Sequence, residues 1–197
     1  MKVLIGCGLI LAISTAQAQT GYQFRAVDFP GSANTAIYAV NDRGEFVGAE
    51  KDINGAHHAI FDNGRHLALL DAAGLIGTSP ESWAFSINDL GDIAGTYTDT
   101  SGTFHGYVHH ADRTITHIEF PNATGTKAYG VNDRGTVIGV YIDTDGNTRS
   151  FMLRKGRYRN MDLPGGTPSF GTTPLSVNDS DVIVGELTRT DGTNGCG

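Results

Sequence analysis

The sequence has little cysteine: two residues among 197. Cys7 falls in an apolar N-terminal stretch that we expect to be removed as a leader, which leaves only Cys196. A single cysteine cannot form an intramolecular disulfide, so the sequence excludes a fold held together by disulfide bonds. The fold must instead be stabilised by a hydrophobic core, and a chain of this length can bury one.

Basic residues are also scarce. The chain has 14 Lys and Arg against 21 Asp and Glu, a formal net charge of −7. Without the expected leader, which contains Lys2 and no acid, the charge is 13 − 21 = −8. An acidic surface argues against nucleic acid and anionic membranes as partners. Arg154-Lys155, Arg157 and Arg159 form one small basic group, which we interpret as a solvated strand and turn.

Beyond the N-terminus there is no long apolar run, so no membrane-spanning segment is predicted. The apolar stretch from Val3 to Ile13 follows Lys2 and precedes Ala16-Gln17-Ala18. This is the pattern of a signal peptide with its cleavage site. We therefore predict a signal peptide over residues 1–18 and one domain over residues 19–197, secreted to the periplasm or the cell exterior.

The sequence is rich in glycine, with 27 residues, and it contains an internal repeat. One nine-residue motif occurs four times, with its asparagines 47, 44 and 46 residues apart: VNDRGEFVG (40–48), INDLGDIAG (87–95), VNDRGTVIG (131–139) and VNDSDVIVG (177–185). Each asparagine has a bulky apolar residue three positions before it and a glycine seven positions after it. A site is usually formed once, whereas a turn is needed in every unit, so we interpret the motif as structural.

Each motif has the residues of a β-hairpin. Asn-Asp favours the start of a turn, and the following glycine favours a left-handed position, as in a type I turn with a G1 bulge. In the fourth copy Asp181 replaces this glycine, and aspartate tolerates the left-handed region better than most residues. A second Asp-Gly turn and two further strands follow, with the turns at 52–55, 99–102 and 143–146.

These patterns predict an all-β fold, a β-propeller-like array of four-stranded repeats of about 45 residues. We expect about four blades, with units around 32–74, 75–122, 123–165 and 166–197. Residues 22–31 match the last strand of a unit and are predicted to act as an N-terminal closing strand. A third strand near Gly195 is not expected, so the last blade is predicted to be incomplete and open to oligomerisation. A β-solenoid is the main alternative.

The repeated motifs resemble the HAF-type bacterial extracellular repeat family. The resemblance rests on the four hairpins, on His58-Ala59-Ile60 and His105-Gly106-Tyr107, and on closing segments such as Asp162-Leu163-Pro164-Gly165. It implies a secreted bacterial protein with a propeller-like fold, and it implies no reaction. The chain departs from the pattern at Asp181, at Arg149, where histidine is lost, and in the missing terminal strand.

Residues that could carry chemistry are few, and the sequence assigns no catalytic or metal-binding residue. Seven histidines lie in the first two full units: His57, His58, His66, His105, His109, His110 and His117. His58 and His105 occupy equivalent positions one unit apart, so they are not expected to converge on zinc. Asp143-Thr144-Asp145-Gly146 has part of a calcium loop, but the remaining ligands are absent. No cofactor is therefore predicted, with calcium at the Asp-Gly turns as the alternative.

The most irregular segment is 71–82, which contains Glu81 and precedes Trp83, the only tryptophan. Trp83 suits a core position, and the alternative is a sugar-stacking platform. The sequence favours a secreted, non-enzymatic repeat protein with a binding or structural surface, whose ligand is unknown. A polysaccharide or a cell-envelope protein is the expected type of partner. The alternatives are a polysaccharide-acting hydrolase or lyase on a propeller scaffold, and a fragment of a longer repeat protein.

Overall fold

The computed structural model describes residues 2–5, 23–70, 81–162, 172–188 and 194–196. These residues form seventeen strands and contain no helix. Accordingly, no helix in the described ranges is suited to crossing a membrane. The prediction of an all-β fold is confirmed. The signal peptide stays a prediction, because most of residues 1–18 lie outside the described ranges.

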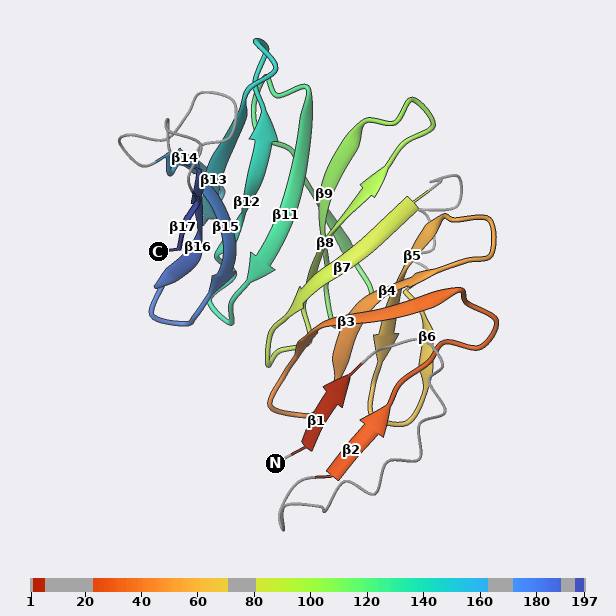
Figure 1. Cartoon of the computed structure of the whole chain (residues 1–197). Helices are drawn as coiled ribbons and strands as arrows, with labels where there is room; N and C mark the ends of the chain where they lie inside the picture. Colours follow the sequence, from red (N-terminus) through yellow and green to blue (C-terminus); the bar gives the residue numbers. More distant parts are fainter. Residues whose placement is uncertain (1, 6–22, 71–80, 163–171, 189–193, 197) are drawn as a thin grey trace.

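Three antiparallel sheets each have four strands in chain order (Figure 1). The first sheet comprises β3 (Asn34–Val40), β4 (Phe46–Lys51), β5 (His57–Asp62) and β6 (Leu67–Leu69). The second comprises β7 (Glu81–Ile87), β8 (Ile93–Thr98), β9 (Phe104–His109) and β10 (Ile115–Ile118). The third comprises β11 (Gly125–Val131), β12 (Val137–Ile142), β13 (Thr148–Arg154) and β14 (Arg157–Asn160). The predicted four-stranded repeats are thus present.

The last sheet has three strands: β15 (Thr172–Val177), β16 (Ile183–Thr188) and β17 (Asn194–Cys196). The sequence-based expectation that a third strand is missing was wrong, because Cys196 pairs with Glu186 and Asn194 with Thr188. Strand pairing uses the backbone NH and C=O groups, so the apolar pair found in the other third strands is not required for it.

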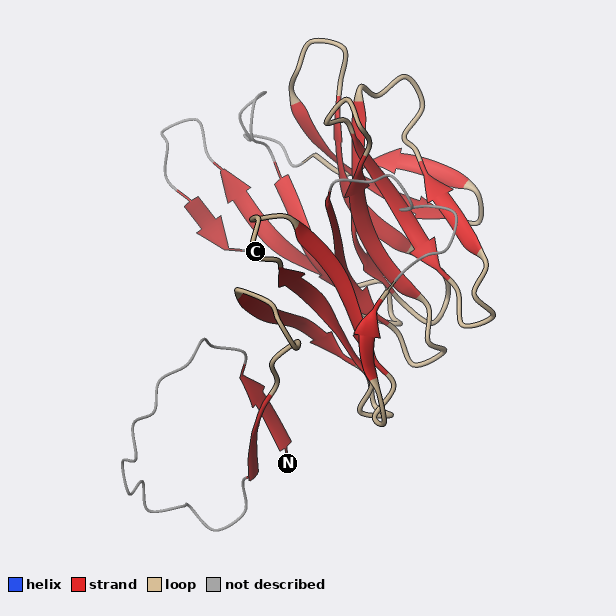
Figure 2. Cartoon of the chain, turned by 90° about the vertical axis from the view of Figure 1, so that its right-hand side faces the viewer, coloured by secondary structure: helices blue, strands red, loops and turns tan. Residues whose placement is uncertain are grey.

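The expected N-terminal closing strand contains β2 (Gln23–Ala26). This strand pairs in parallel with β1 (Lys2–Ile5). Figure 2 shows the β1–β2 pair set apart from the four larger sheets. Arg25 Nη2 lies 3.8 Å from the Asp62 carboxylate, so β2 is nevertheless connected to the first sheet.

The four sheets pack one after another. In the second, third and last sheets, the first strand contacts the preceding sheet. Strand β7 contacts β3, β4 and β5, strand β11 contacts β7, β8 and β9, and strand β15 contacts β11, β12 and β13. Two core clusters fill the first two borders. Val47 of the first sheet belongs to a cluster with Ile87 of the second, and Ala94 of the second belongs to one with Val131 of the third. Hydrophobic burial between neighbouring sheets therefore stabilises the array.

The first turn of each sheet has the predicted geometry. In the first unit, the Gly44 NH donates to the Asn41 carbonyl and the Asn41 NH donates to the Glu45 carbonyl. Gly44, Gly91, Gly135 and Asp181 all have positive φ, between 60° and 91°. The type I turn with a G1 bulge is confirmed, and Asp181 adopts the left-handed conformation as expected.

The same turns also connect the sheets, which the sequence analysis did not anticipate. The side-chain amides of Asn41, Asn88 and Asn132 donate to the carbonyls of Asn88, Asn132 and Asn178, at 3.1, 3.1 and 2.8 Å. The backbone NH groups of Asp42, Asp89 and Asp133 donate to the carboxylates of Asp89, Asp133 and Asp179, at 2.7–2.9 Å. We call this double row of bonds the Asn-Asp ladder. It joins each unit to the next.

A β-bulge in the first strand of each sheet explains the bulky residue three positions before each motif asparagine and the glycine seven positions after it. The pairing of β7 with β8 shifts between Ala84 and Ser86, so Phe85 is the extra residue, and the same shift occurs at Tyr38, Tyr129 and Leu175. Opposite the bulge, a Cβ at Gly139 would overlap the Lys127 carbonyl oxygen, and Gly48, Gly95 and Gly185 are equivalent. The bulged side chains form a row, with ring centroids of Tyr38 and Phe85 5.4 Å apart and those of Phe85 and Tyr129 5.2 Å apart.

Candidate binding surface

The ends of the sheets opposite the Asn-Asp ladder carry residues that change from unit to unit. Here the third strand of one sheet begins beside the first strand of the next. At the first border the His57 and Trp83 rings have centroids 5.3 Å apart. At the second border the equivalent residues are Phe104 and Lys127, whose Nζ lies 3.5 Å from the ring centroid. We call His57, Glu81, Trp83, Phe104 and Lys127 the variable edge.

The His57 ring is held between two residues of β7. Its Nδ1 lies 3.1 Å from Glu81 Oε1, while the ring packs on Trp83. Both His57 and Glu81 are about one-third exposed, so polar atoms and an aromatic surface meet at solvent. The sequence-based preference for Trp83 in the core is replaced by a half-buried position at the rim of the first border.

At the second border, the Lys127 ammonium lies over the Phe104 ring. This is a cation–π contact, worth about 0.5–2 kcal/mol according to how far it is desolvated. Partial burial lowers the pKa of Lys127, because the charged form loses part of its hydration. The two borders therefore share one geometry but differ in charge: an acid and an imidazole at the first, an ammonium at the second.

Close to this edge, each of the first three sheets holds a histidine or arginine side chain against an aspartate of its second turn. His58 Nε2 lies 3.7 Å from Asp52, His105 Nε2 lies 3.3 Å from Asp99, and Arg149 Nε lies 3.2 Å from Asp143. Where histidine is replaced by Arg149, the turn thus keeps a basic side chain as its partner. The sequence showed the change from histidine to arginine but not the contact of this side chain with the aspartate of the turn.

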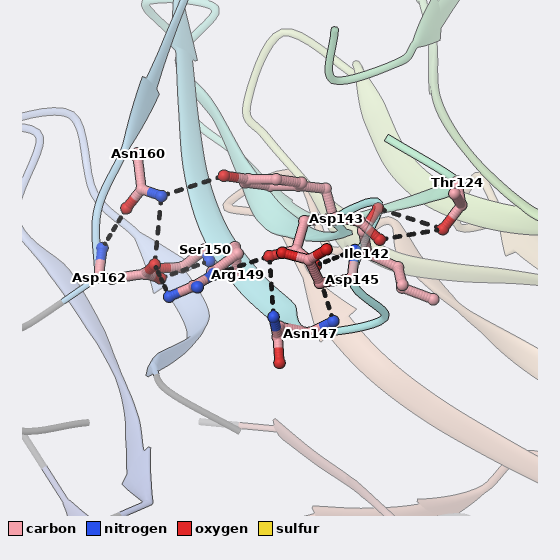
Figure 3. Close-up of polar contacts among 10 residues, drawn as sticks. Thr124, Ile142, Asp143, Asp145, Asn147, Arg149, Ser150, Asn160 and Asp162 are labelled. Atoms are coloured by element: carbon pink, nitrogen blue, oxygen red, sulfur yellow. Dashed lines mark hydrogen bonds and ion pairs between the residues drawn. The ribbon is translucent and has the colours of Figure 1, made fainter. Parts of the chain in front are cut away.

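A second acid completes this arrangement in the second and third sheets. His105 Nδ1 lies 2.8 Å from Glu119. Arg149 Nη1 lies 3.3 Å from Asp162, and Figure 3 shows Arg149 between its two carboxylates. Beside each cation a tyrosine bonds to a side chain of the fourth strand: Tyr97 to His117 at 3.3 Å, and Tyr141 to Asn160 at 3.0 Å.

These contacts shift the ionisation of the charged groups. Partial burial disfavours the His105 imidazolium, but its hydrogen bonds to Glu119 and Asp99 and their negative charges outweigh this, so its pKa is raised. Hydrogen bonds from the Ser101 hydroxyl and the Thr103 NH lower the pKa of Asp99. Bonds from the Asn147 NH and side chain, and from Arg149, lower the pKa of Asp143. These contacts therefore favour the charged forms of His105, Asp99 and Asp143.

The Asp-Gly turns use their carboxylates within the turn. Asp143 Oδ1 accepts hydrogen bonds from the Asp145 and Asn147 NH groups, at 3.0 and 2.8 Å. Asp52 and Asp99 make the same pair of bonds in their own turns. Among the described residues, no three His, Cys, Asp or Glu side chains are grouped as a metal site would need.

The other histidines are dispersed. His110 Nδ1 lies 3.1 Å from Asp92, at the first turn of the second sheet. His109 is half-buried, which lowers its pKa because burial penalises the imidazolium. His66 is exposed in the turn before β6. Of the basic group, Arg154 bonds Asp181 of the last sheet at 2.9 Å, while Lys155, Arg157 and Arg159 are exposed as expected.

An apolar cavity of about 260 Å³ lies where the third and last sheets meet, lined by Met161, Pro174, Ile183 and Leu187. It opens over Gly185. The corresponding space over Gly95 is filled by Tyr107, and that over Gly139 is approached by Phe151. Gly197 has the sequence position equivalent to these aromatic residues and lies outside the described ranges.

Comparisons with known proteins do not identify this surface. No protein-family model matches the chain, and no curated protein matches it.

Proposed function

We propose that this chain is a secreted, non-enzymatic, β-propeller-like repeat protein and that its variable edge binds an extracellular polysaccharide. The observation that carries the proposal is the group of Trp83, His57 and Glu81 at positions that are filled differently in the other units. The N-terminal signal pattern and the resemblance to HAF-type repeats support secretion.

The chemistry of this group suits a sugar. Binding sites combine an apolar or aromatic surface with a few placed polar groups. A pyranose ring offers an apolar face that can lie on an indole, and hydroxyl groups that can bond a carboxylate and an imidazole. The second border repeats this combination with Phe104 and Lys127. A polymer that runs along the edge would therefore meet two platforms of similar build.

The single tryptophan provides a direct test, because emission excited near the indole absorption edge reports Trp83 alone. The full chain is titrated with a neutral glucan, a mannan, chitin oligosaccharides and an acidic polysaccharide. We expect one of them to shift the emission and to protect Trp83 from iodide quenching. Trp83→Ala should weaken binding of the same polysaccharide by up to about tenfold in affinity electrophoresis, if stacking on the indole is worth about as much as an aromatic pair, about 0.5–1.5 kcal/mol.

Leu90→Ala is the matched control. Leu90 is an exposed apolar residue in a first turn, at the opposite end of its sheet from the variable edge. Its replacement should leave both the emission change and the electrophoretic retardation unaltered. If none of the polysaccharides alters Trp83 emission, or if Trp83→Ala binds as the wild type does, the proposal is wrong.

A further inference from the structure

The two ends of the array leave apolar positions uncovered that are covered at every inner border. The sixth residue after the motif asparagine is Val47, Ala94 and Ile138 in the first three sheets, and each is 0% exposed. In the last sheet this position is Val184, which is 50% exposed. In the first three units the next sheet lies against the strand that carries this position, since β7 contacts β4, β11 contacts β8 and β15 contacts β12. Val47 shares a core cluster with Ile87 of the next sheet.

In the first sheet, a different apolar position is exposed, at the residue that directly precedes the motif asparagine. The residue before the motif asparagine is Ile87 in the second sheet and Val131 in the third, and these are only 6% and 4% exposed. In the first sheet it is Val40, which is 58% exposed. Phe46 and Ile60 of the first sheet are buried, whereas Val40 at the end of β3 is exposed beside the turn.

The Asn-Asp ladder has a direction, and its two ends are complementary. At each inner border, the earlier unit donates through its Asn side chain and Asp NH, and the later unit accepts. In the last unit, no bond from the Asn178 side-chain amide or the Asp179 NH to another described residue is found. Asn178 is exposed, whereas Asn41, Asn88 and Asn132 are buried. In the first unit, the Asp42 carboxylate receives no NH from another described residue.

We propose that copies of this chain associate head to tail, with the last sheet of one copy docking on the first sheet of the next. Val184 of one copy packs on Val40 of the other. The Asn178 side chain donates to the Asn41 carbonyl, and the Asp179 NH donates to the Asp42 carboxylate. This contact continues the geometry of the inner borders. Between described residues, no extensive contact joins the last sheet to the first within one chain.

Such an interface is heterologous, because two different surfaces meet, so it extends to chains or closes into rings. The contact is small, so the association is weak and depends on protein concentration. Sedimentation velocity of the full chain across a hundredfold range of concentration tests it. We expect the weight-average sedimentation coefficient to rise with concentration for the wild type. Val40→Asp alone and Val184→Asp alone should each remain monomeric at all concentrations.

The decisive sample is an equimolar mixture of the two variants. Val40→Asp keeps an intact last sheet and Val184→Asp keeps an intact first sheet, so the mixture can form one productive contact. We expect a 1:1 dimer that grows no further. Ile53→Asp, at an exposed apolar residue in the second turn of the first sheet and at the opposite end of its strands from Val40, should associate as the wild type does. Unchanged thermal unfolding midpoints confirm that the variants are folded, since both valines are already exposed.

Three results would overturn the proposal. The first is a wild-type chain that stays monomeric at the highest concentration. The second is self-association of either single variant at wild-type strength. The third is a mixture of the two variants that stays monomeric.

Discussion

The side-chain amide of Asn88 donates to the carbonyl oxygen of Asn132, 44 residues later in the chain, across 3.1 Å. Its side-chain oxygen accepts the Asp92 NH at 2.8 Å. One buried side chain thus fixes its own turn and the position of the next sheet.

The first prediction compares Asn88→Ala with Asn178→Ala. Asn88→Ala should lower the free energy of unfolding by about 2–3 kcal/mol, because a buried carbonyl and a buried NH each lose a partner. Asn178 makes the local turn bonds, and its side-chain amide bonds no other described sheet, so Asn178→Ala should cost about 1 kcal/mol or less. Urea unfolding midpoints measure both. Equal losses would show that the bond between sheets contributes nothing.

The second prediction concerns two glycines of the third sheet. Gly139→Ala should destabilise by about 3 kcal/mol or more, because the new methyl group overlaps the Lys127 carbonyl oxygen and the bulge must shift. Gly135→Val should cost about 1–2 kcal/mol, for a left-handed φ with open space around it. Chemical denaturation gives the order of the two variants, and the reverse order would contradict the role of the bulge.

The third prediction uses one repeat position in two environments. Val47→Ala should cost about 2 kcal/mol, since a fully buried side chain loses two methyl groups. Val184→Ala removes the same groups from a half-exposed side chain and should change the unfolding free energy of the dilute protein by less than about 0.5 kcal/mol. Thermal unfolding at low protein concentration measures the difference, and a large effect of Val184→Ala would mean that its face is covered within the chain.

The fourth prediction concerns pH. The His105 pKa is raised in the folded protein, so its stabilising contribution is fully present below the unfolded value of about 6.5 and is lost as pH rises through the folded value. The Asp99 pKa is lowered, so its contribution is present above about 3.9 and is lost as pH falls further. His105→Gln should therefore flatten the decrease in stability between about pH 6 and 8.

His66→Gln is the control for this measurement, because His66 is exposed and its ring has no hydrogen bond to another described residue. Unfolding midpoints at half-unit intervals of pH should keep the wild-type slope in this variant. A wild-type slope in His105→Gln as well would exclude the pair with Glu119 and Asp99 as its source.

The sequence was sufficient for the features that depend on neighbours in the chain. Asn41, Gly44 and Asp181 lie within five residues of the groups that determine their turn geometry, so the all-β fold, the hairpins and the left-handed Asp181 could be predicted. The short strand β17 was missed, because its pairing depends on backbone groups and its residues lack an apolar pattern.

Contacts between units could not be predicted from the sequence, because they join residues more than 40 positions apart. Asp133 has the residue type of a local turn former, yet its carboxylate accepts the Asp89 NH from the preceding sheet. The repeated Gly139 and Tyr129 positions were visible in the sequence, but only the bulge explains why one must be small and the other is extra. The variable edge could have been found by comparing equivalent positions of the units, because Trp83 and Lys127 both stand five residues before their asparagines.

The direction of the Asn-Asp ladder also bears on how such a gene can change. Each inner unit donates to the next unit the same two hydrogen bonds that it accepts from the preceding unit. A duplicated or deleted segment of one repeat therefore leaves matched donors and acceptors at the new junction. Copy number can then drift without compensating substitutions, as in other arrays whose units contact only their neighbours. The residues at the opposite ends of the sheets can meanwhile change from unit to unit without altering the ladder.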